Sequence, residues 1–279
     1  MDEQISPYGK NPIGNTGKVR IRHLQEMKER GKKWTMLTSY DMYTATIFEE
    51  AGIPVLLVGD SAANNVFGYD SSLPVTVDEL LPLVRAVTRS TKRSLVIADL
   101  PFGSYQGSPE ECFHTAARFM KEGGAHAVKL EGGREMLPQV KKLASSGIPV
   151  MAHIGFTPQA EHQLGGYRVQ GKEDEGRQLV ELAKAFETAG AFALLIEMVP
   201  AAVGAAITKA VNIPTVGIGA GNGCDAQVLV WQDMAGLRQG SLPRFVKQYA
   251  NMNALLHKAA ADFAAEVEGG TFPGNEHSF

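Results

Sequence analysis

The amino-acid sequence predicts an α/β protein folded as a single (β/α)8 TIM barrel, with one helix before the barrel and further helices after it. Short apolar segments, mostly continuous runs of Val, Ile and Leu, recur along the chain. Such runs are typical of parallel strands buried on both faces. Segments of helical periodicity alternate with them, which indicates a parallel sheet. The length of 279 residues suits a closed barrel, which typically runs to about 250 residues. An open doubly wound sheet is the second choice.

The elements follow one another in a regular order. An amphipathic helix is expected from about residue 18 to Gly31, where a glycine ends it. The strands are expected at residues 34–40, 54–60, 94–100, 127–131, 149–155, 192–198, 214–219 and, as the eighth, 227–233. The helices between them are expected at residues 42–53, 76–91, 108–124, 134–148, 173–191 and 200–213. Pro82 and Pro138 fall within two of these helices, each expected near a first turn or at a kink.

The chain shows no linker that would divide it, so one domain over residues 1–279 is expected. Residues 241–270 predict one or two helices outside the barrel. The polar ends, residues 1–17 and 269–279, are expected to be loose tails.

Charge and composition exclude several classes of protein. Lys plus Arg number 27 and Asp plus Glu number 30, and this net charge of -3 argues against a general nucleic-acid or membrane-surface role. No apolar run reaches the roughly 18 residues of a membrane-spanning helix, and the start lacks the apolar core of a secretory signal. The two cysteines, Cys112 and Cys224, match no metal-binding spacing. A reduced, cytoplasmic protein is the simplest interpretation.

Ionisable residues stand where the expected strands end. Each alone has an ordinary structural explanation, such as a loop or helix cap for an Asp or a hydrogen-bonded structural role for a His. In an α/β barrel, however, the carboxyl ends of the strands meet at one mouth, where active sites are built. Six such residues are therefore expected in one site: Asp60, Asp99, Lys129, Glu131, His153 and Glu197.

The segment AVKLE, residues 127–131, shows the argument most clearly. Lys129 and Glu131 are two positions apart, so they point to the same face of a strand. Burying an amine and a carboxylate in an apolar interior is costly without partners. The side chains on that face are therefore expected to contact a bound ion or substrate.

The residue types favour a hard divalent cation. Several carboxylates with one histidine and no cysteine suit Mg²⁺, with coordination positions left for water and substrate, whereas zinc would call for more His or Cys ligands. Lys129 is then expected to balance charge or to bind a substrate anion. The alternative is a Schiff-base lysine, which the nearby carboxylates disfavour because they keep the amine protonated.

Two further segments bear on the mouth of the barrel. The glycine-rich segment 217–223 is a weak phosphate- or dinucleotide-binding signal, because no clear helix follows it. Tight backbone packing is the better explanation of its glycines. The long polar segment 156–175 is expected to form a lid.

Taken together, nine motifs resemble the ketopantoate hydroxymethyltransferase family, also called 3-methyl-2-oxobutanoate hydroxymethyltransferase. They run in order through nearly the whole barrel: MLTSYD, LLVGDS, ADLPFGSY, VKLEGG, HIGFTPQ, GGYRVQG, EMVP, IPTVGIGAG and DAQVLV. The resemblance implies a metal-dependent (β/α)8 enzyme of pantothenate biosynthesis, usually a homo-oligomer and often a decamer. It would transfer a hydroxymethyl group from 5,10-methylenetetrahydrofolate to 3-methyl-2-oxobutanoate, giving 2-dehydropantoate through an enolate stabilised by Mg²⁺.

The resemblance also implies roles, position by position. The metal ligands would be Asp60 and Asp99, which also border the substrate, with Glu131 as the third acidic position, acting through a water. Ser61 and Lys129 would contact the substrate carboxylate, with His153 as a nearby polar contact, and Glu197 would be the base. One departure is visible: many members read Leu-Gly-Met after GDS, where this chain has Ala62, Ala63 and Asn64.

Two other functions are alternatives to this one. The first is another metal-dependent lyase or phosphomutase-type barrel enzyme that acts on a pyruvate-like 2-oxo acid. Many of those carry a catalytic cysteine in a Lys-Lys-Cys-Gly-His-type loop, and neither cysteine here lies in such a loop. The second is an inactive scaffold with this fold, against which the presence of every acidic strand-end residue argues.

Overall fold

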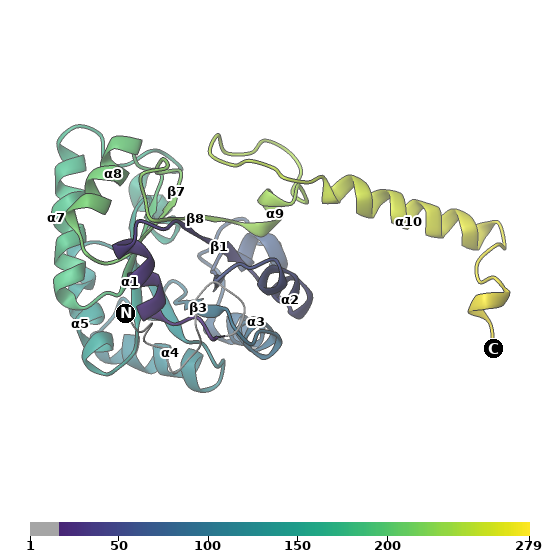
Figure 1. Ribbon diagram of the computed structural model, residues 1–279, viewed down its shortest axis with the longest axis horizontal. Coiled ribbons are helices and arrows are strands. Elements are labelled where there is room, and N and C mark those ends of the chain that lie inside the picture. The colour runs from purple at the N-terminus through teal and green to yellow at the C-terminus, as the bar shows by residue number, and fades with distance from the viewer. Residues whose placement is uncertain (1–16) are drawn as a thin grey trace, which may run out of the picture. The chain divides into compact units, whose positions relative to one another are not determined.

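Eight parallel strands close into a barrel in the computed structural model, which describes residues 17–279 (Figure 1). The strands pair in chain order, and β8 pairs with β1 to complete the circle. The predicted (β/α)8 barrel is therefore confirmed. The tail predicted for residues 1–17 lies outside the described residues, residue 17 excepted. The strands are β1 Trp34–Thr38, β2 Val55–Val58, β3 Leu95–Asp99, β4 Ala127–Glu131, β5 Val150–Gly155, β6 Ala193–Glu197, β7 Thr215–Ile218 and β8 Ala226–Leu229.

Helices follow the strands where the sequence predicts them. In α3 the Thr76 hydroxyl accepts from the Glu79 N–H and Glu79 accepts from the Thr76 N–H, a capping box that fixes the first turn. Pro82 lies inside α3 without ending it, and Pro138 lies in the first turn of α5, where its missing N–H costs nothing. The helices around the barrel are α2 Met42–Glu50, α3 Val77–Ser90, α4 Pro109–Lys121, α5 Leu137–Ser145, α7 Asp174–Ala189 and α8 Ala201–Ala210.

The eighth strand is shorter than predicted. It ends at Leu229, and Trp231–Met234 forms the short helix α9, so the prediction of a strand over residues 227–233 was wrong for its last part. A short apolar run does not by itself distinguish a buried strand from a helical turn.

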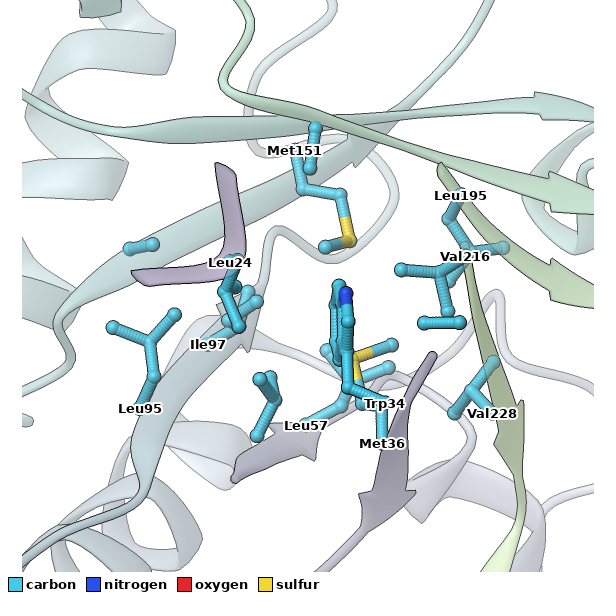
Figure 2. Close-up of a cluster of buried hydrophobic side chains, with 14 of the residues drawn as sticks. Leu24, Trp34, Met36, Leu57, Leu95, Ile97, Met151, Leu195, Val216 and Val228 are labelled. Atoms are coloured by element: carbon cyan, nitrogen blue, oxygen red, sulfur yellow. The ribbon is translucent and has the colours of Figure 1, made fainter. Parts of the chain in front are cut away.

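The barrel interior is apolar at one end and polar at the other. The amino-terminal helix α1 Ile21–Glu29 contributes Leu24 and Met27 to a buried cluster. Figure 2 shows Leu24 of this helix near Trp34 and Met36 of β1. Val19 and the inward residues of the other strands complete the cluster: Val55, Leu57, Leu95, Ile97, Ala127, Met151, Ala193, Leu195, Val216, Ala226 and Val228.

On strands β3 to β6 the next inward position is polar, whereas on β7 it is the apolar Ile218. On β3 the sequence of inward residues is Leu95, Ile97 and then Asp99, and on β4 it is Ala127 and then Lys129. The apolar cluster thus supports a polar layer at the carboxyl ends of the strands, where rigid backbone holds each side chain in place.

Residues Val230–Phe279 form a second compact unit. It contains α9, α10 Met252–Glu268 and a short 3-10 turn, and α10 confirms the helix expected within residues 241–270. Within the predicted tail, the Phe272 ring packs edge-on against Phe263 of α10. The single-domain organisation stays a prediction. From residue 17 to the end, no helix is long and apolar enough to cross a membrane.

Candidate active site

Four adjacent strands, β3 to β6, bring five of the six predicted ionisable residues together, and Asp60 follows β2. The parallel register places Asp99 beside Lys129, and Glu131 beside His153. Glu197 ends β6 in the same layer, opposite Gly155 of β5. Of these residues, Asp99, Lys129, Glu131 and His153 are each at most 4% exposed. The convergence that the sequence predicts is therefore observed.

Lys129 lies at the centre of this layer. Its Nζ is 2.9 Å from Asp99 Oδ1, 3.4 Å from Glu131 Oε1 and 3.3 Å from His153 Nδ1. Burial lowers the pKa of the amine, but the carboxylates of Asp99, Glu131 and Asp60 outweigh burial, so the pKa is raised above its ordinary value. Lys129 is an ammonium ion, which supports a charge-balancing or anion-binding role and argues against a Schiff base.

His153 joins two carboxylates. Its Nδ1 lies 3.1 Å from Glu131 Oε1, and its Nε2 lies 3.3 Å from Glu197 Oε2. Burial lowers the pKa of His153, but the charge of Glu131 and the hydrogen bonds to Glu131 and Glu197 raise it to about 9. The raised pKa favours the imidazolium form, whose Nδ1 contacts Glu131 and whose Nε2 forms an ion pair with the Glu197 carboxylate.

The backbone around Glu197 is equally constrained. The Phe156 N–H donates to the Glu197 carbonyl at 2.8 Å. Gly155 approaches that carbonyl so closely that a Cβ there would lie 2.3 Å from the oxygen. The next residue, Met198, has a φ of 47°, a left-handed conformation that is uncommon for a residue other than Gly. The chain thus turns sharply immediately after the Glu197 side chain leaves the strand.

Asp60 and Asp99 form a buried pair of carboxylates. The Asp60 N–H donates to Asp99 Oδ2 at 3.1 Å, so the two residues are held together by the backbone. Burial and the charges of Asp99 and Glu131 raise the pKa of Asp60 well above its ordinary value. The pKa of Asp99 is also raised, by burial first, although Lys129 offsets part of the effect. Two carboxylates that are costly to ionise together fit a site that a divalent cation completes.

Glu131 is already bound by protein groups. Its Oε1 contacts Lys129 and His153, and its Oε2 accepts from the Gln159 N–H at 3.0 Å. Burial raises the pKa of Glu131, but His153, Lys129 and these hydrogen bonds lower it to about 2. Across residues 17–279, no three or more His, Cys, Asp or Glu side chains are gathered as a metal-binding group. The structure therefore brings Asp60 and Asp99 together as a pair and leaves Glu131 in its own ion-pair network.

Ser61 lies beside this pair, in the turn after β2. Its hydroxyl is hydrogen-bonded to the buried Tyr40 hydroxyl at 2.8 Å. Ala62 and Ala63, which depart from the family pattern, are fully buried at the start of the π-helix η1 Ala63–Phe67. Asn64 is exposed and donates to the Tyr69 carbonyl instead.

Three residues of the site were missed in the sequence: Tyr40, Tyr105 and Gln159. Tyr105 is buried, and its hydroxyl donates to Gln159 Oε1 at 2.7 Å. The Gln159 amide donates in turn to Asp60 Oδ2 at 2.9 Å. All three stand inside the family motifs, which was the available signal, but uncharged polar residues in or near loops give no chemical sign of burial.

The two segments near the mouth behave differently. For residues 217–223 tight packing is confirmed, because a Cβ at Gly221 would lie 2.5 Å from the Ala201 Cβ of α8. Strand β8 follows this segment, so no helix begins where a phosphate would bind. In the long segment 156–175, the Gln170 N–H donates to the Met198 carbonyl at 2.9 Å, beside Glu197. Its role as a lid stays a prediction.

A model of the ketopantoate hydroxymethyltransferase family matches residues 18–275, which includes every residue of this site. The chain belongs to the ketopantoate hydroxymethyltransferase family. Relatives described as 3-methyl-2-oxobutanoate hydroxymethyltransferase include one from Nocardioides sp. that is 62% identical, covering 99% of this chain and 97% of the relative. Another, from Mycobacterium bovis strain BCG, is 57% identical over the full length of both chains.

Solved structures show the same barrel outside the ketopantoate hydroxymethyltransferase family. A phosphonopyruvate hydrolase in complex with oxalate and Mg²⁺ has a TM-score of 0.60 at 14% identity, covering 92% of each chain. A 2,3-dimethylmalate lyase has a TM-score of 0.54 at 15% identity, covering 90% of this chain and 98% of the other. Because likeness at this identity concerns the fold alone, the family assignment rests on the sequence relatives.

Proposed function

We propose that this protein transfers a hydroxymethyl group from 5,10-methylenetetrahydrofolate to 3-methyl-2-oxobutanoate. With one water consumed, the products are 2-dehydropantoate and tetrahydrofolate, and the reaction belongs to pantothenate biosynthesis. Family membership supports the reaction. The observation that carries the mechanism is the buried layer in which the Asp60–Asp99 pair, Lys129 and the His153–Glu197 pair share one mouth.

Asp60 and Asp99 are the residues that would hold Mg²⁺. A magnesium site in an enzyme uses one or two carboxylates and leaves its other positions to water and substrate, which suits this pair. Glu131 would act through a water, because protein groups already bind both of its oxygens. When bound, Mg²⁺ would supply Lewis-acid polarisation of the 2-oxo acid.

Lys129 and Ser61 would bind the substrate carboxylate. The ammonium group of Lys129 is buried and positively charged, so an anion placed against it gains a charge-assisted hydrogen bond at low dielectric. The Ser61 hydroxyl is held in place by Tyr40. His153 would remain a charged contact on the far side of Lys129.

Glu197 would remove the proton from C3 of the substrate. Its carboxylate is ionically paired to His153 and its side chain is 15% exposed, so it borders the mouth and does not lie sealed in the core. The carbanion formed at C3, delocalised as an enolate, would then form the new carbon–carbon bond to the one-carbon unit of the folate. The carbon–nitrogen bonds that hold this unit to the folate break, and the water consumed supplies the hydroxyl group. Removing a general base of this kind typically costs about 10²–10⁴-fold in rate.

The test is proton exchange without the one-carbon donor. The protein is incubated with 3-methyl-2-oxobutanoate in D₂O, and loss of the C3 proton signal is followed by NMR with Mg²⁺ and with EDTA. We expect exchange with Mg²⁺ only, and its loss in Glu197→Gln. The matched control is Glu181→Gln, which changes an exposed carboxylate paired with Lys184 and should exchange like the wild type.

Two outcomes would contradict the proposal. Wild-type exchange rates in Glu197→Gln would show that Glu197 is not the base. No exchange in the wild type, with Mg²⁺ present and with or without tetrahydrofolate, would show that the substrate is a different acid. Assembly as a homo-oligomer, the decamer included, and a cytoplasmic location stay predictions.

A further inference from the structure

The side-chain amide of Gln159 is completely hydrogen-bonded at the base of the site. Its Nε2 donates to Asp60 Oδ2 at 2.9 Å and to the Leu100 carbonyl at 3.0 Å. Its Oε1 accepts from the Tyr105 hydroxyl at 2.7 Å and from Gln106 Nε2 at 3.3 Å. Both amide hydrogens and both lone pairs of the oxygen are therefore used.

These partners allow only one orientation of the amide. If the amide were flipped, its oxygen would face the Leu100 carbonyl, which has no hydrogen to share, and Asp60 Oδ2, which has none in the ionised form that holds a cation. The Tyr105 hydroxyl supports the observed orientation from the other side. Its one hydrogen has two acceptors in reach, Gln159 Oε1 at 2.7 Å and the Glu131 carbonyl at 3.0 Å, and the contact to Gln159 is the shorter. The group is 6% exposed, so solvent offers no ready replacement for these bonds.

Gln159 also holds the second acidic side chain of the site. Its backbone N–H donates to Glu131 Oε2 at 3.0 Å. One residue thus binds an oxygen of Glu131 and an oxygen of Asp60. Within the described part of the chain no hydrogen bond to Asp60 Oδ1 is observed, so this oxygen is the one left to contact a ligand.

We propose that Gln159 is a positioning residue for the cation site. By binding Asp60 Oδ2, it fixes the carboxylate so that Oδ1 faces the cation beside Asp99, and it keeps Asp60 from turning to pair with Lys129. The proposal rests on the proposed cation role of Asp60 and Asp99. Losing a hydrogen-bond partner that orients a metal ligand typically weakens metal binding about 10- to 100-fold.

The experiment measures binding of Mn²⁺ alone, with no substrate and no turnover. Free Mn²⁺ is counted by its EPR signal in titrations of the full-length protein, and circular dichroism reports folding. In Gln159→Met, which keeps the volume and removes the amide, we expect the Kd for Mn²⁺ to rise at least about 10-fold. The matched control is Gln139→Met. Gln139 is similarly buried, at 4% exposed. Its side-chain amide donates to the backbone carbonyls of Tyr105 and Gln106 and to no acidic side chain. We expect its Kd to stay within about twofold of the wild type.

The outcomes separate this inference from the function on which it rests. If the wild type binds Mn²⁺ and folded Gln159→Met binds it equally well, the positioning role is wrong while the cation site stands. If the wild type binds no Mn²⁺, the cation site itself is wrong and the inference fails with it.

A second variant covers the case in which Gln159→Met does not fold. Tyr105→Phe removes one hydroxyl and with it the bond that orients the amide. We expect its Kd for Mn²⁺ to rise at least about threefold, since the amide oxygen then keeps only the longer contact to Gln106 and the amide is held less firmly against Asp60. An unchanged Kd in folded Tyr105→Phe would overturn the inference.

Discussion

Replacing Lys129 with Met tests whether the polar layer depends on one buried positive charge. The change removes the ammonium group 2.9 Å from Asp99 and 3.4 Å from Glu131 and leaves both carboxylates buried. Breaking a buried ion pair by removing one partner costs about 3–5 kcal/mol. For a chain of this size that free energy corresponds to a fall in Tm of roughly 10 °C.

The loss of stability should depend on pH in a defined direction. Without Lys129 the carboxyl of Asp99 loses the positive charge that lowers its pKa, so its pKa in the folded variant rises further above the unfolded value. A carboxyl whose folded pKa is raised contributes stability at low pH, and that stability is lost as the pH rises through the folded pKa. The difference in Tm between wild type and Lys129→Met should therefore be smaller at pH 5 than at pH 8.

The assay is thermal unfolding followed by circular dichroism, in EDTA, at both pH values. Lys28→Met is the matched control, because Lys28 pairs with Asp225 at 2.8 Å, partly buried, and touches none of the mouth residues. Lys28→Met should also lose stability, but it should keep the wild-type rate of proton exchange at C3 of the substrate. Lys129→Met should lose that exchange. A Tm for Lys129→Met within about 2 °C of the wild type at pH 8 would refute the reasoning.

Three further predictions concern the site and its support. Asp99→Ala should abolish Mg²⁺-dependent proton exchange because it removes one of the two proposed metal ligands. The circular dichroism spectrum should stay unchanged because the carboxyl that is removed is costly to ionise in the folded state. Unchanged exchange activity would exclude Asp99 as a ligand. Gly155→Ala should reduce kcat because its Cβ would press on the Glu197 carbonyl, and steady-state kinetics at wild-type rates would contradict the close approach. His126 accepts a hydrogen bond from the Val96 N–H, and burial, with the charges of Lys18 and Arg20, lowers its pKa to about 4. The neutral ring therefore stabilises the folded state above the unfolded pKa of about 6.5, and this stabilisation is lost as the pH falls below that value. His126→Asn keeps an acceptor and cannot titrate, so its Tm should fall less than that of the wild type between pH 7 and pH 5.

The sequence determined the fold and most members of the site, for a local reason. Strand runs, helix caps and glycine stops are set by neighbouring residues, so their alternation predicted the barrel along the chain. Once a barrel is predicted, the carboxyl ends of its strands meet at one mouth, and Asp99 or Glu197 is placed there without any knowledge of contacts. The same local reasoning failed at Trp231, where an apolar run continues from a strand into a helical turn.

Only the tertiary structure decided how the members of the site divide their roles. Asp60 and Gln159 are 99 positions apart, and nothing near either residue indicates that an amide of one binds a carboxylate of the other. The bridge of His153 between Glu131 and Glu197 is likewise a contact of three strands. Hydrogen bonds and ion pairs act over a few ångströms in space, whereas sequence patterns record distance along the chain, so these partners become visible only when the barrel closes.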